Sequence, residues 1–337
     1  MIYYRPIAMT DAARPDAALP LAGGWCWFDR VEVLERGRAP VLVSAAEVPS
    51  APLQALTAPR AALAGLALDR PRLMGILNVT PDSFADGGPF LAPAAALAQG
   101  RAMAAAGADV IDIGGESTRP GAAEVSITDE TARTAPVIAA LRAGGVPALI
   151  SIDTRKAAVA EAALAAGSGM VNDVAAFSFD PALAKVVAHA AVPVCLMHAQ
   201  GTPATMQADP QYDDVVLDVY DFLAERIAAA EAAGIARARI VVDPGIGFGK
   251  TQVHNLALIR GLALFHGLSC AIVLGASRKR FIGSIGGQAQ ADRRGPGSTA
   301  VALASVAQGV QVLRVHDVAD TRQALALWQA VTVGVVT

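Results

Sequence analysis

From residue 72 onward the chain repeats one pattern: a short apolar run that ends in polar or glycine residues, then an alanine-rich segment of helical composition. Several runs are apolar at every position, which is typical of parallel strands buried on both faces. Eight such units over about 260 residues match the size of a closed (β/α)8 barrel. The strands are expected at residues 73–78, 109–114, 148–153, 170–173, 192–198, 240–245, 271–277 and 310–316.

Alanine-rich stretches between these runs predict the helices, and the order of the elements sets the fold class. The competing architecture is an open doubly wound sheet. The first strand is not followed by the glycine-rich fingerprint of a dinucleotide-binding fold, which favours the barrel. We therefore predict an α/β fold, a (β/α)8 TIM barrel over residues 72–337. The helices are expected at residues 94–106, 129–143, 156–166, 181–189, 215–233, 255–264, 298–308 and 318–331.

Residues 1–71 do not follow the repeat, and we expect an N-terminal extension that is irregular or a small β-containing appendage. Residues 25–34 can form one or two strands, whereas residues 40–59 contain four prolines and are expected to be an irregular connector. Trp25, Trp27 and Phe28 are expected to fill a local core rather than to bind a ligand. The extension carries no catalytic constellation.

Charge and cysteine content exclude several classes of protein. The net charge is −3 and the calculated isoelectric point is about 6.0, so no basic field exists to hold nucleic acid or an anionic membrane. The three cysteines are far apart and predict neither a disulfide framework nor a metal site. The sequence has no signal-peptide pattern and no apolar run long enough to span a membrane, so we expect a cytoplasmic protein.

Polar residues recur at the predicted C-terminal ends of the strands, which meet over one mouth in a barrel. A single member of this set could simply cap the next helix, but repetition at matched positions predicts a shared ligand site. The strand ends carry Asn78, Asp112, Asp153, Asn172, His198, Asp243, Ser277, Arg314 and His316, and nearby loops add Arg119, Arg278 and Lys279.

The chemistry of this set points to a flat, phosphorylated small molecule. Carboxylates and an amide suit a heterocycle rich in N–H donors and ring acceptors, and the strand ends supply Asp153, Asn172 and Asp243. Cationic side chains suit phosphate or carboxylate oxygens, and the set supplies Arg119, Lys279, Arg314 and His316. Asn78 offers a hard oxygen that can join phosphates and water around Mg²⁺.

A ligand-binding or catalytic role is less strongly indicated for other residues in the mouth. The glycine-rich run 245–249 lacks the spacing of a phosphate-binding loop, so we expect a tight turn beside a ligand, with Phe248 as a stacking or packing ring. His198 is expected to be a hydrogen-bonded wall residue, because no metal-type partner accompanies it. Serine nucleophiles are not indicated, since no histidine signature adjoins Ser83, Ser117 or Ser277. We expect three further histidines to lie on helices or at the surface: His189, His254 and His266.

Eight ordered motifs give the chain a family resemblance. They are NVTPDSFADGG from Asn78, DIGGESTRPGA from Asp112, SIDT from Ser151, VNDV from Val171, LMHAQGTP from Leu196, VVDPGIGFGKT from Val241, SRKRFIG from Ser277 and RVHDV from Arg314. With them, residues 72–334 resemble the dihydropteroate synthases of folate biosynthesis. These enzymes join p-aminobenzoate to a dihydropterin that bears a hydroxymethyl pyrophosphate, and they release pyrophosphate.

The resemblance assigns roles to residues of the mouth. It implies a pterin pocket built from Asp153, Asn172, Asp243 and Lys279. It implies a pyrophosphate and Mg²⁺ subsite at Asn78, Arg314 and His316, with Asn78 as the protein's metal ligand. The edge where the two substrates meet is implied at Thr118, Arg119 and Ser277, in part on the loops that follow Asn78 and Gly115. Direct roles in catalysis are implied for Asp112, Arg119 and Lys279. A homodimer is implied as well.

Some positions depart from the family pattern, and two other functions share its features. Ala85 stands where serine is usual, Ala199 where methionine is usual, and Ala175 and Ala176 where a Ser-Gly pair is common. A pterin-dependent methyltransferase would share the barrel and the pterin pocket but should lack the TPDSF loop and the paired Arg314 and His316. A pterin-binding paralogue without turnover is the other alternative.

Overall fold

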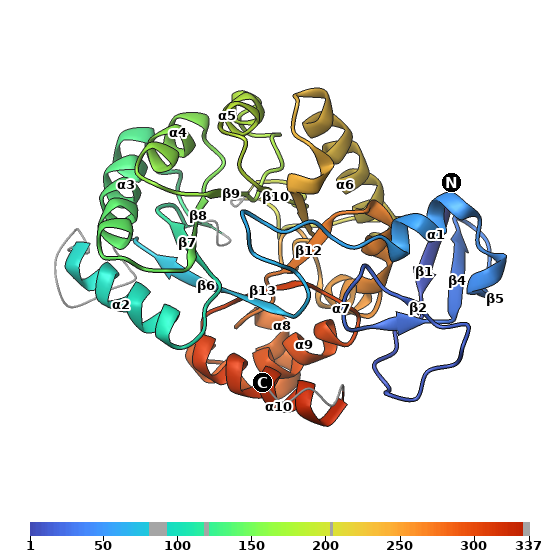
Figure 1. Cartoon of the computed structure of the whole chain (residues 1–337). Helices are drawn as coiled ribbons and strands as arrows, with labels where there is room; N and C mark the ends of the chain where they lie inside the picture. The colour runs from blue at the N-terminus through green and yellow to red at the C-terminus, as the bar shows by residue number, and fades with distance from the viewer. Residues whose placement is uncertain (81–92, 118–120, 203–204, 333–337) are drawn as a thin grey trace.

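The computed structural model describes residues 1–80, 93–117, 121–202 and 205–332, and its centre is a closed barrel of eight parallel strands (Figure 1). Neighbouring strands follow the chain order, and the last strand pairs with the first. The predicted (β/α)8 barrel is therefore confirmed. Its strands are β6 (Arg72–Asn78), β7 (Val110–Gly114), β8 (Leu149–Asp153), β9 (Met170–Asp173), β10 (Val194–Met197), β11 (Ile240–Asp243), β12 (Ala271–Leu274) and β13 (Val312–Val315).

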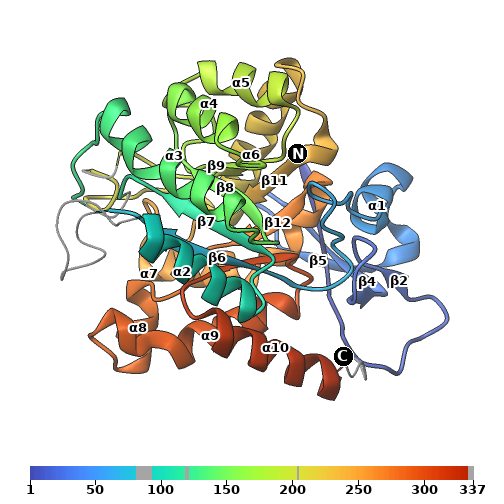
Figure 2. The ribbon, with the colours of Figure 1, turned by 60° about the vertical axis from the view of Figure 1, so that its left-hand side comes forward.

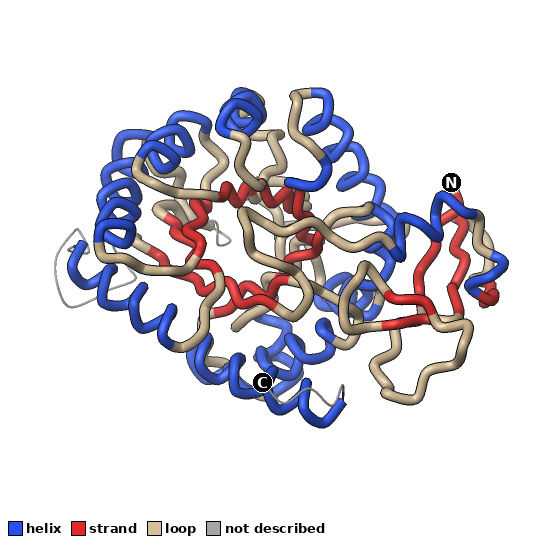
Figure 3. Tube along the Cα trace, in the orientation of Figure 1, coloured by secondary structure: helices blue, strands red, loops and turns tan. Residues whose placement is uncertain are grey.

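Helices surround this ring of strands (Figure 3). The outer ring comprises α2 (Pro93–Ala105), α3 (Ile127–Ala143), α4 (Ala157–Ala165), α5 (Ala182–Ala190), α6 (Val215–Ala232), α7 (Gln252–Arg260), α9 (Gly295–Val306) and α10 (Val318–Thr332). Shorter elements in the loops are η3 (Arg237–Arg239), η4 (Leu262–Leu268), α8 (Arg280–Gly286) and η5 (Ala291–Arg294). The single helix expected over residues 255–264 is wrong. Helix α7 ends at Gly261, and the 3-10 helix η4 follows it.

The register of the strands aligns the ends that carry polar residues. Asn78 pairs with Gly114, Gly114 with Asp153, and Asp153 with Asn172. Because side chains alternate between the interior and the helices along each strand, residues in one such row project over one end of the barrel. The apolar strand sequences thus place the polar set at one mouth.

The N-terminal segment contains regular structure of its own. An antiparallel sheet joins β1 (Ile2–Pro6), β4 (Arg30–Glu35) and β5 (Val41–Ser44), and β2 (Leu19–Pro20) pairs with β3 (Trp27–Phe28). The strands expected within residues 25–34 are present as β3 and β4. Trp25, Trp27 and Phe28 are buried, and Trp25 Nε1 donates to Val306 O at 2.8 Å. Their predicted role in a local core is confirmed.

The irregular connector expected over residues 40–59 is wrong. This stretch contains β5, a 3-10 turn η1 (Ala45–Glu47) and helix α1 (Ser50–Thr57). The prolines are compatible with the helix because Pro49 lies at its N-cap and Pro52 in its first turn. Backbone N–H groups there have no partner within the helix, so proline costs little.

The N-terminal sheet is attached to the outside of the barrel (Figure 2). Strand β1 contacts η4, and the sheet also contacts α6. Tyr3 is buried, its hydroxyl donates to Asp221 at 2.9 Å, and its ring meets that of Tyr220 edge-on. Arg36 forms ion pairs with Asp218 at 2.6 Å and with Asp221 at 2.8 Å. The segment therefore docks on the flank of the barrel through both apolar and charged contacts.

Residues shortly before β6 close the end of the barrel opposite the mouth. Leu63 and Leu68 are buried in one cluster with side chains from the beginnings of the strands, among them Met74, Val110 and Val312. The segment turns between Leu63 and Leu66 and crosses this end of the ring (Figure 1). By its packing, the stretch after α1 belongs with the barrel; the domain boundary at residue 72 remains a prediction.

Two N-terminal truncations should separate docking from closure of the barrel. We expect a chain lacking residues 1–68 to lose at least about 3 kcal/mol of unfolding free energy relative to one lacking residues 1–58, because each buried leucine side chain contributes about 2–5 kcal/mol. Urea unfolding of the two truncated chains measures the difference. Equal midpoints would show that Leu63 and Leu68 do not support the barrel.

Cys26, Cys195 and Cys270 are buried and unpaired. Among the described residues, no helix combines the length and the apolar character needed to cross a membrane.

Candidate active site

The structure brings the described members of the predicted polar set to the mouth of the barrel. Asp112 lies on β7, Asp153 ends β8, and Asn172 lies on β9. The others are Asn78 at the end of β6, His198 after β10, Asp243 at the end of β11, Ser277, Arg278 and Lys279 after β12, Arg314 on β13 and His316 just beyond it. No residue of the N-terminal extension belongs to this set.

Four of these residues form one buried network. Asp112 is fully buried, and its Oδ2 accepts hydrogen bonds from Asn172 Nδ2 at 2.9 Å and from Arg314 Nε at 2.7 Å. Arg314 Nη2 donates to Asp153 Oδ2 at 2.7 Å. Arg314 thus reaches across β6 and β7 to hold two carboxylates. Asp112 Oδ1 has no hydrogen-bond partner among the described residues, although it is buried.

This network perturbs the titration of Asp153. Burial raises the pKa of Asp153 to about 7; the Arg314 charge opposes the shift and Asp112 adds to it. Arg314 Nη1 has no hydrogen-bond partner among the described residues, so this nitrogen can bind a further anion while the two ion pairs stay in place. A carboxylate that titrates near neutrality is a feature of functional sites.

Asp243 occupies a second buried position in the mouth. Its Oδ1 accepts from the backbone N–H of Gly245 at 2.7 Å, whereas its Oδ2 has no partner in the described part of the chain. A β-carbon at Gly275 would lie 3.5 Å from that Oδ2 and 3.8 Å from Arg314 Cδ, so glycine leaves room between the two charges. Burial raises the pKa of Asp243. One carboxylate oxygen is therefore available to a ligand with N–H donors.

The glycine-rich run after β11 forms the predicted tight turn. Gly245, Gly247 and Gly249 all have positive φ angles, which glycine adopts without steric cost. The turn presents the ring of Phe248, and Lys279 Nζ lies 4.1 Å from the centre of that ring. This distance is that of a cation–π contact. Phe248 and Lys279 thus form one wall of the mouth next to Asp243.

Ser277 and His316 form a third group. His316 Nδ1 lies 3.0 Å from Ser277 Oγ, and the backbone N–H of His316 donates to the same hydroxyl at 3.3 Å. Spacing along the chain did not indicate this pair, because Ser277 follows β12 and His316 follows β13. Together they offer a hydroxyl and a ring nitrogen to an oxygen-bearing ligand.

Part of the predicted site lies outside the described residues. Thr118 and Arg119, and most of the loop that follows Asn78, fall there, so their predicted roles are not addressed by the geometry. The described residues contain no group of three or more His, Cys, Asp or Glu side chains that could hold a metal ion. Any protein ligand from the predicted set would be Asn78, whose Oδ1 faces Gly114, 3.3 Å from the position of a β-carbon there.

The predicted role of His198 as a wall is consistent with its surroundings. The side chain is buried, its Nδ1 lies 2.8 Å from Lys250 Nζ, and its ring packs edge-on against Phe222. Burial lowers the pKa of His198 to about 2, so the ring is neutral. His266 lies in the 3-10 helix η4, within the expectation of a helix or surface position, and it is fully buried there.

Sequence reasoning missed two groups that support the mouth. Asp173 is buried and accepts from the backbone N–H groups of Ala175 at 2.8 Å and Phe177 at 2.6 Å. Glu116 accepts from Lys156 Nζ at 3.2 Å and from the N–H of Val125 at 2.9 Å, which ties together the two ends of the loop after β7. The available signals were a charged residue that ends strand β9, Asp173, and one that follows the glycines at the end of β7, Glu116.

Two of the unusual positions can be placed. Ala176 has φ +48°, in the left-handed region where glycine is favoured, and the Asp173 hydrogen bonds hold the flanking residues. Ala199 is half-buried beside His198. Ala85 lies outside the described residues.

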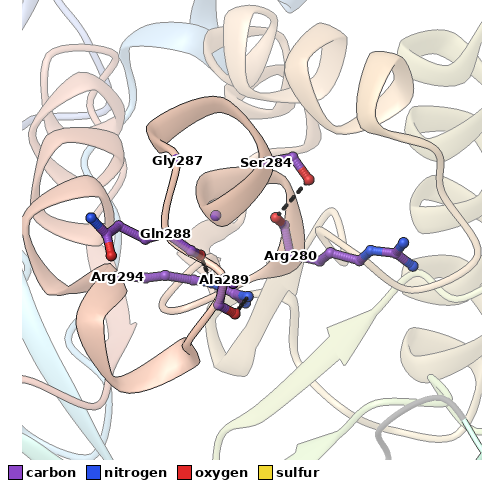
Figure 4. Close-up of a pocket in the computed structure, with 7 residues that line it drawn as sticks. Arg280, Ser284, Gly287, Gln288, Ala289 and Arg294 are labelled. Atoms are coloured by element: carbon purple, nitrogen blue, oxygen red, sulfur yellow. Dashed lines mark hydrogen bonds between the residues drawn. The ribbon is translucent and has the colours of Figure 1, made fainter.

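A cavity of about 430 Å³ lies between α8 and η5, separate from the predicted set (Figure 4). Its lining includes Arg280, Ser284 and Arg294, and Arg294 already donates to the carbonyl oxygens of Gln288 and Ala289. No residue of the predicted site lines this cavity, so it does not replace the mouth as the candidate site.

Comparison with known proteins agrees with the fold. Residues 74–316 match the family model described as pterin binding enzyme. The dihydropteroate synthase of Neisseria meningitidis serogroup B is 48% identical over 270 residues, which cover 79% of this chain and 94% of that protein. A structure of Xanthomonas albilineans dihydropteroate synthase with 4-aminobenzoic acid matches with a TM-score of 0.76 and 49% identity, over 81% of this chain and 98% of that one.

A further structure of the Xanthomonas albilineans enzyme, in complex with 7,8-dihydropteroate, matches with a TM-score of 0.73 and 46% identity over the same shares of the two chains. A barrel with a buried acidic and amide-lined mouth, matched over this length, defines the class: the chain belongs to the family of pterin-binding enzymes. Within that family it groups with the dihydropteroate synthases, transferases of folate biosynthesis. The resemblance inferred from the motifs is confirmed.

Proposed function

We propose that the barrel mouth condenses (7,8-dihydropterin-6-yl)methyl diphosphate with p-aminobenzoate, giving 7,8-dihydropteroate and pyrophosphate. The single observation that carries the proposal is the buried set of Asp112, Asp153, Asn172 and Asp243 at one end of a barrel that matches dihydropteroate synthases. A pterin ring presents N–H donors and ring acceptors on its edge. Buried carboxylates need such donors, because an unpaired buried charge is costly.

The pterin ring is assigned to the space between the two acidic groups. Asp243 Oδ2 and the carboxylate of Asp153 would accept from its N–H groups, and Asn172 would fix its orientation. Phe248 and Lys279 would cover one side, at the cation–π distance they already have. Binding at this depth excludes water, which strengthens each polar contact.

The diphosphate is assigned to Arg314, His316 and Ser277 at the rim. Arg314 supports this with its remaining nitrogen, Nη1, and the Ser277–His316 pair supports it with polar side chains just after β12 and β13. Arg119 and Thr118 are assigned to the edge where p-aminobenzoate approaches. Cationic groups near the diphosphate stabilise the charge that develops as it departs.

The chemistry needs little help from a general base. The aromatic amine of p-aminobenzoate is neutral and nucleophilic at neutral pH. It forms a C–N bond to the methylene carbon as the C–O bond to the diphosphate breaks, and the ammonium proton is then released to solvent. The electron-rich pterin and the carboxylates below it stabilise positive charge on the methylene group. Asp112 would add to this stabilisation through its negative charge. Lys279 would act through its contact with the Phe248 ring, which covers one side of the pterin.

Mg²⁺ is proposed as the cofactor, with Asn78 as the protein ligand. Mg²⁺ in phosphate sites commonly takes one or two protein oxygens and completes its shell with substrate phosphates and water. One carboxamide oxygen at the end of β6, with no cluster of acidic ligands among the described residues, fits that pattern. When bound, the ion would neutralise charge on the diphosphate.

Pyrophosphate release tests the function directly. We expect release from the dihydropterin diphosphate only when p-aminobenzoate is present, together with formation of 7,8-dihydropteroate. Binding of the pterin without any release would favour the non-catalytic paralogue. Transfer of a methyl group from a methylated pterin would favour the methyltransferase; the presence of both Arg314 and His316 argues against it.

Pterin binding should depend on the ionisation of Asp153. Because its folded-state pKa of about 7 lies above the value of about 3.9 for an unfolded aspartate, the folded protein retains a proton that the unfolded chain releases. This group's contribution to stability therefore falls as pH rises through that interval. The ionised form is the better acceptor for pterin N–H groups, so affinity for a pterin without phosphate should rise with pH through about 7.

Calorimetric titrations on either side of pH 7 measure this dependence, with Asp153→Asn as the control. In the variant the dependence should flatten, because the amide does not titrate. A wild-type dissociation constant that stays constant across the interval would remove Asp153 from the pterin contacts.

A homodimer is proposed through the outer faces of α9 and α10, which lie side by side in Figures 1 and 2. Helix α9 contains no charged residue, and α10 contains none after Arg322. Leu327 and Val331 are 66% and 73% exposed on this face. Apolar patches of this kind favour self-association. Light scattering should give the mass of a dimer for the wild type and of a monomer for Leu327→Glu/Val331→Glu; a wild-type monomer would contradict the proposal.

A further inference from the structure

Lys250 is a buried lysine at the mouth to which the proposed reaction gives no role. Its side chain is 3% exposed. Its Nζ lies 2.8 Å from His198 Nδ1, 3.0 Å from Phe248 O and 3.4 Å from His198 O. These hydrogen-bond partners are neutral. A buried ammonium without a directly bonded carboxylate is costly, so a compensating structural or functional role is expected.

The lysine joins two mouth loops whose backbones touch. A β-carbon at Gly245 would lie 1.8 Å from His198 O, and one at Gly249 would lie 2.5 Å from Gln200 O. The turn after β11 is therefore pressed against the loop after β10 with no side chain between them. Lys250 spans this contact, because it bonds His198 on one loop and the carbonyl of Phe248 on the other.

The other polar groups of the turn are held from elsewhere. Asn255 Oδ1 accepts from the N–H of Gly247 at 2.7 Å, and Gln207 Nε2 donates to Gly247 O at 2.6 Å. Tyr212 donates to Gly249 O at 2.7 Å. For the carbonyl of Phe248, Lys250 supplies the side-chain donor. The peptide that carries the Phe248 ring thus depends on Lys250 for its position.

The same lysine also fixes the histidine. When Lys250 is charged it only donates, so His198 Nδ1 then accepts and the hydrogen of the neutral ring is on Nε2. The ring is held further by Phe222, at 4.8 Å between ring centres, and by Tyr212, at 5.9 Å. Burial lowers the pKa of Lys250 well below its usual value, and the nearby Asp243 opposes that shift.

We propose that Lys250 is a positioning residue for the pterin pocket: it clamps the Phe248 peptide to His198 and so holds the Phe248 ring against Lys279. The inference rests on the proposed function, because it assigns the Phe248–Lys279 wall to the pterin ring. Lys250 lies behind that wall and does not touch the substrate. Its loss should therefore weaken pterin binding and leave the chemical step and the p-aminobenzoate site unchanged.

The test compares Lys250→Met, which keeps the unbranched stem of the side chain as far as Cε and removes its donors, with the wild type. For a pterin without phosphate we expect the dissociation constant to rise about tenfold or more, the size of a lost hydrogen bond to a charged group. At saturating pterin substrate, kcat and the KM for p-aminobenzoate should stay at their wild-type values. In Lys250→Ala, added ethylammonium should fill the vacated space and restore part of the pterin affinity.

Val187→Ala is the matched control, because it removes buried volume from α5 without touching the turn. It should lower stability in urea and leave pterin affinity unchanged. Pterin affinity that is normal in Lys250→Met, with a stability loss like that of the control, would overturn the proposal. A fall in kcat at normal pterin affinity would overturn it too, since Lys250 would then act in the chemistry.

A second variant keeps the proposal testable if Lys250→Met does not fold. Lys250→Gln retains one amide donor but is too short to reach both His198 and Phe248, so its pterin affinity must also fall. Wild-type affinity in a folded Lys250→Gln would reject the clamp. Pterin binding by the variants tests the clamp and needs no turnover. Pyrophosphate release by the wild type tests the proposed function. The two proposals therefore fail in different measurements.

Discussion

Asp243→Ala is expected to lower kcat/KM for the pterin substrate. The loss of transition-state stabilisation should be about 2–4 kcal/mol, the cost of removing one partner of a buried hydrogen-bonded charge contact. Two effects combine at this position. The ligand loses the Oδ2 acceptor, and the backbone N–H of Gly245 loses the Oδ1 that holds the turn at 2.7 Å. Steady-state kinetics and calorimetry with a pterin lacking phosphate measure the loss.

Asp243→Asn separates the two effects. Its side-chain oxygen can still accept from the N–H of Gly245. Its NH2 group takes the place of Oδ2 and only donates, so it cannot accept from the ligand. We expect intermediate pterin affinity and a turn that remains in place. Near-normal turnover and affinity in Asp243→Ala would remove Asp243 from the pocket.

Arg314→Ala is expected to lower the free energy of unfolding by about 3–5 kcal/mol, because it leaves buried carboxylates without their cation. Asp112 and Asp153 both lose a 2.7 Å ion pair, and Asp112 Oδ1 already lacks a partner among the described residues. The pterin diphosphate should also bind far more weakly, and a pterin without phosphate less so. Urea unfolding and calorimetry with both ligands report these effects.

Asp153→Asn in the Arg314→Ala background is the internal control. Removing one of the two carboxylate charges should restore part of the lost stability and none of the affinity for the diphosphate. An equal loss of affinity for both pterin ligands would contradict the assignment of Arg314 to the diphosphate. Unchanged stability in Arg314→Ala would show that the network does not support the barrel.

The sequence predicted the barrel because strand burial in a parallel sheet is a local property. The runs 240–242 and 271–274 are apolar at every position, and Asp243 and Gly275 follow them. That pattern needs no knowledge of the partner strands. Helix ends were harder to predict, since α7 stops at Gly261 within a stretch of continuous helical composition. The extension was harder still, because prolines in a first turn look the same as prolines in a loop.

The sequence by itself determined which residues meet at the mouth, since equal strand ends in a closed barrel share one rim. Only the tertiary structure decided which of them touch. Arg314 holds Asp112 and Asp153 from two and three strands away, and Lys250 clamps a turn to a neighbouring loop. These contacts depend on side-chain reach and on backbones brought together by glycines. The spacing of residues along the chain predicts neither the reach of these side chains between strands nor the approach of the backbones, because both arise when the barrel closes.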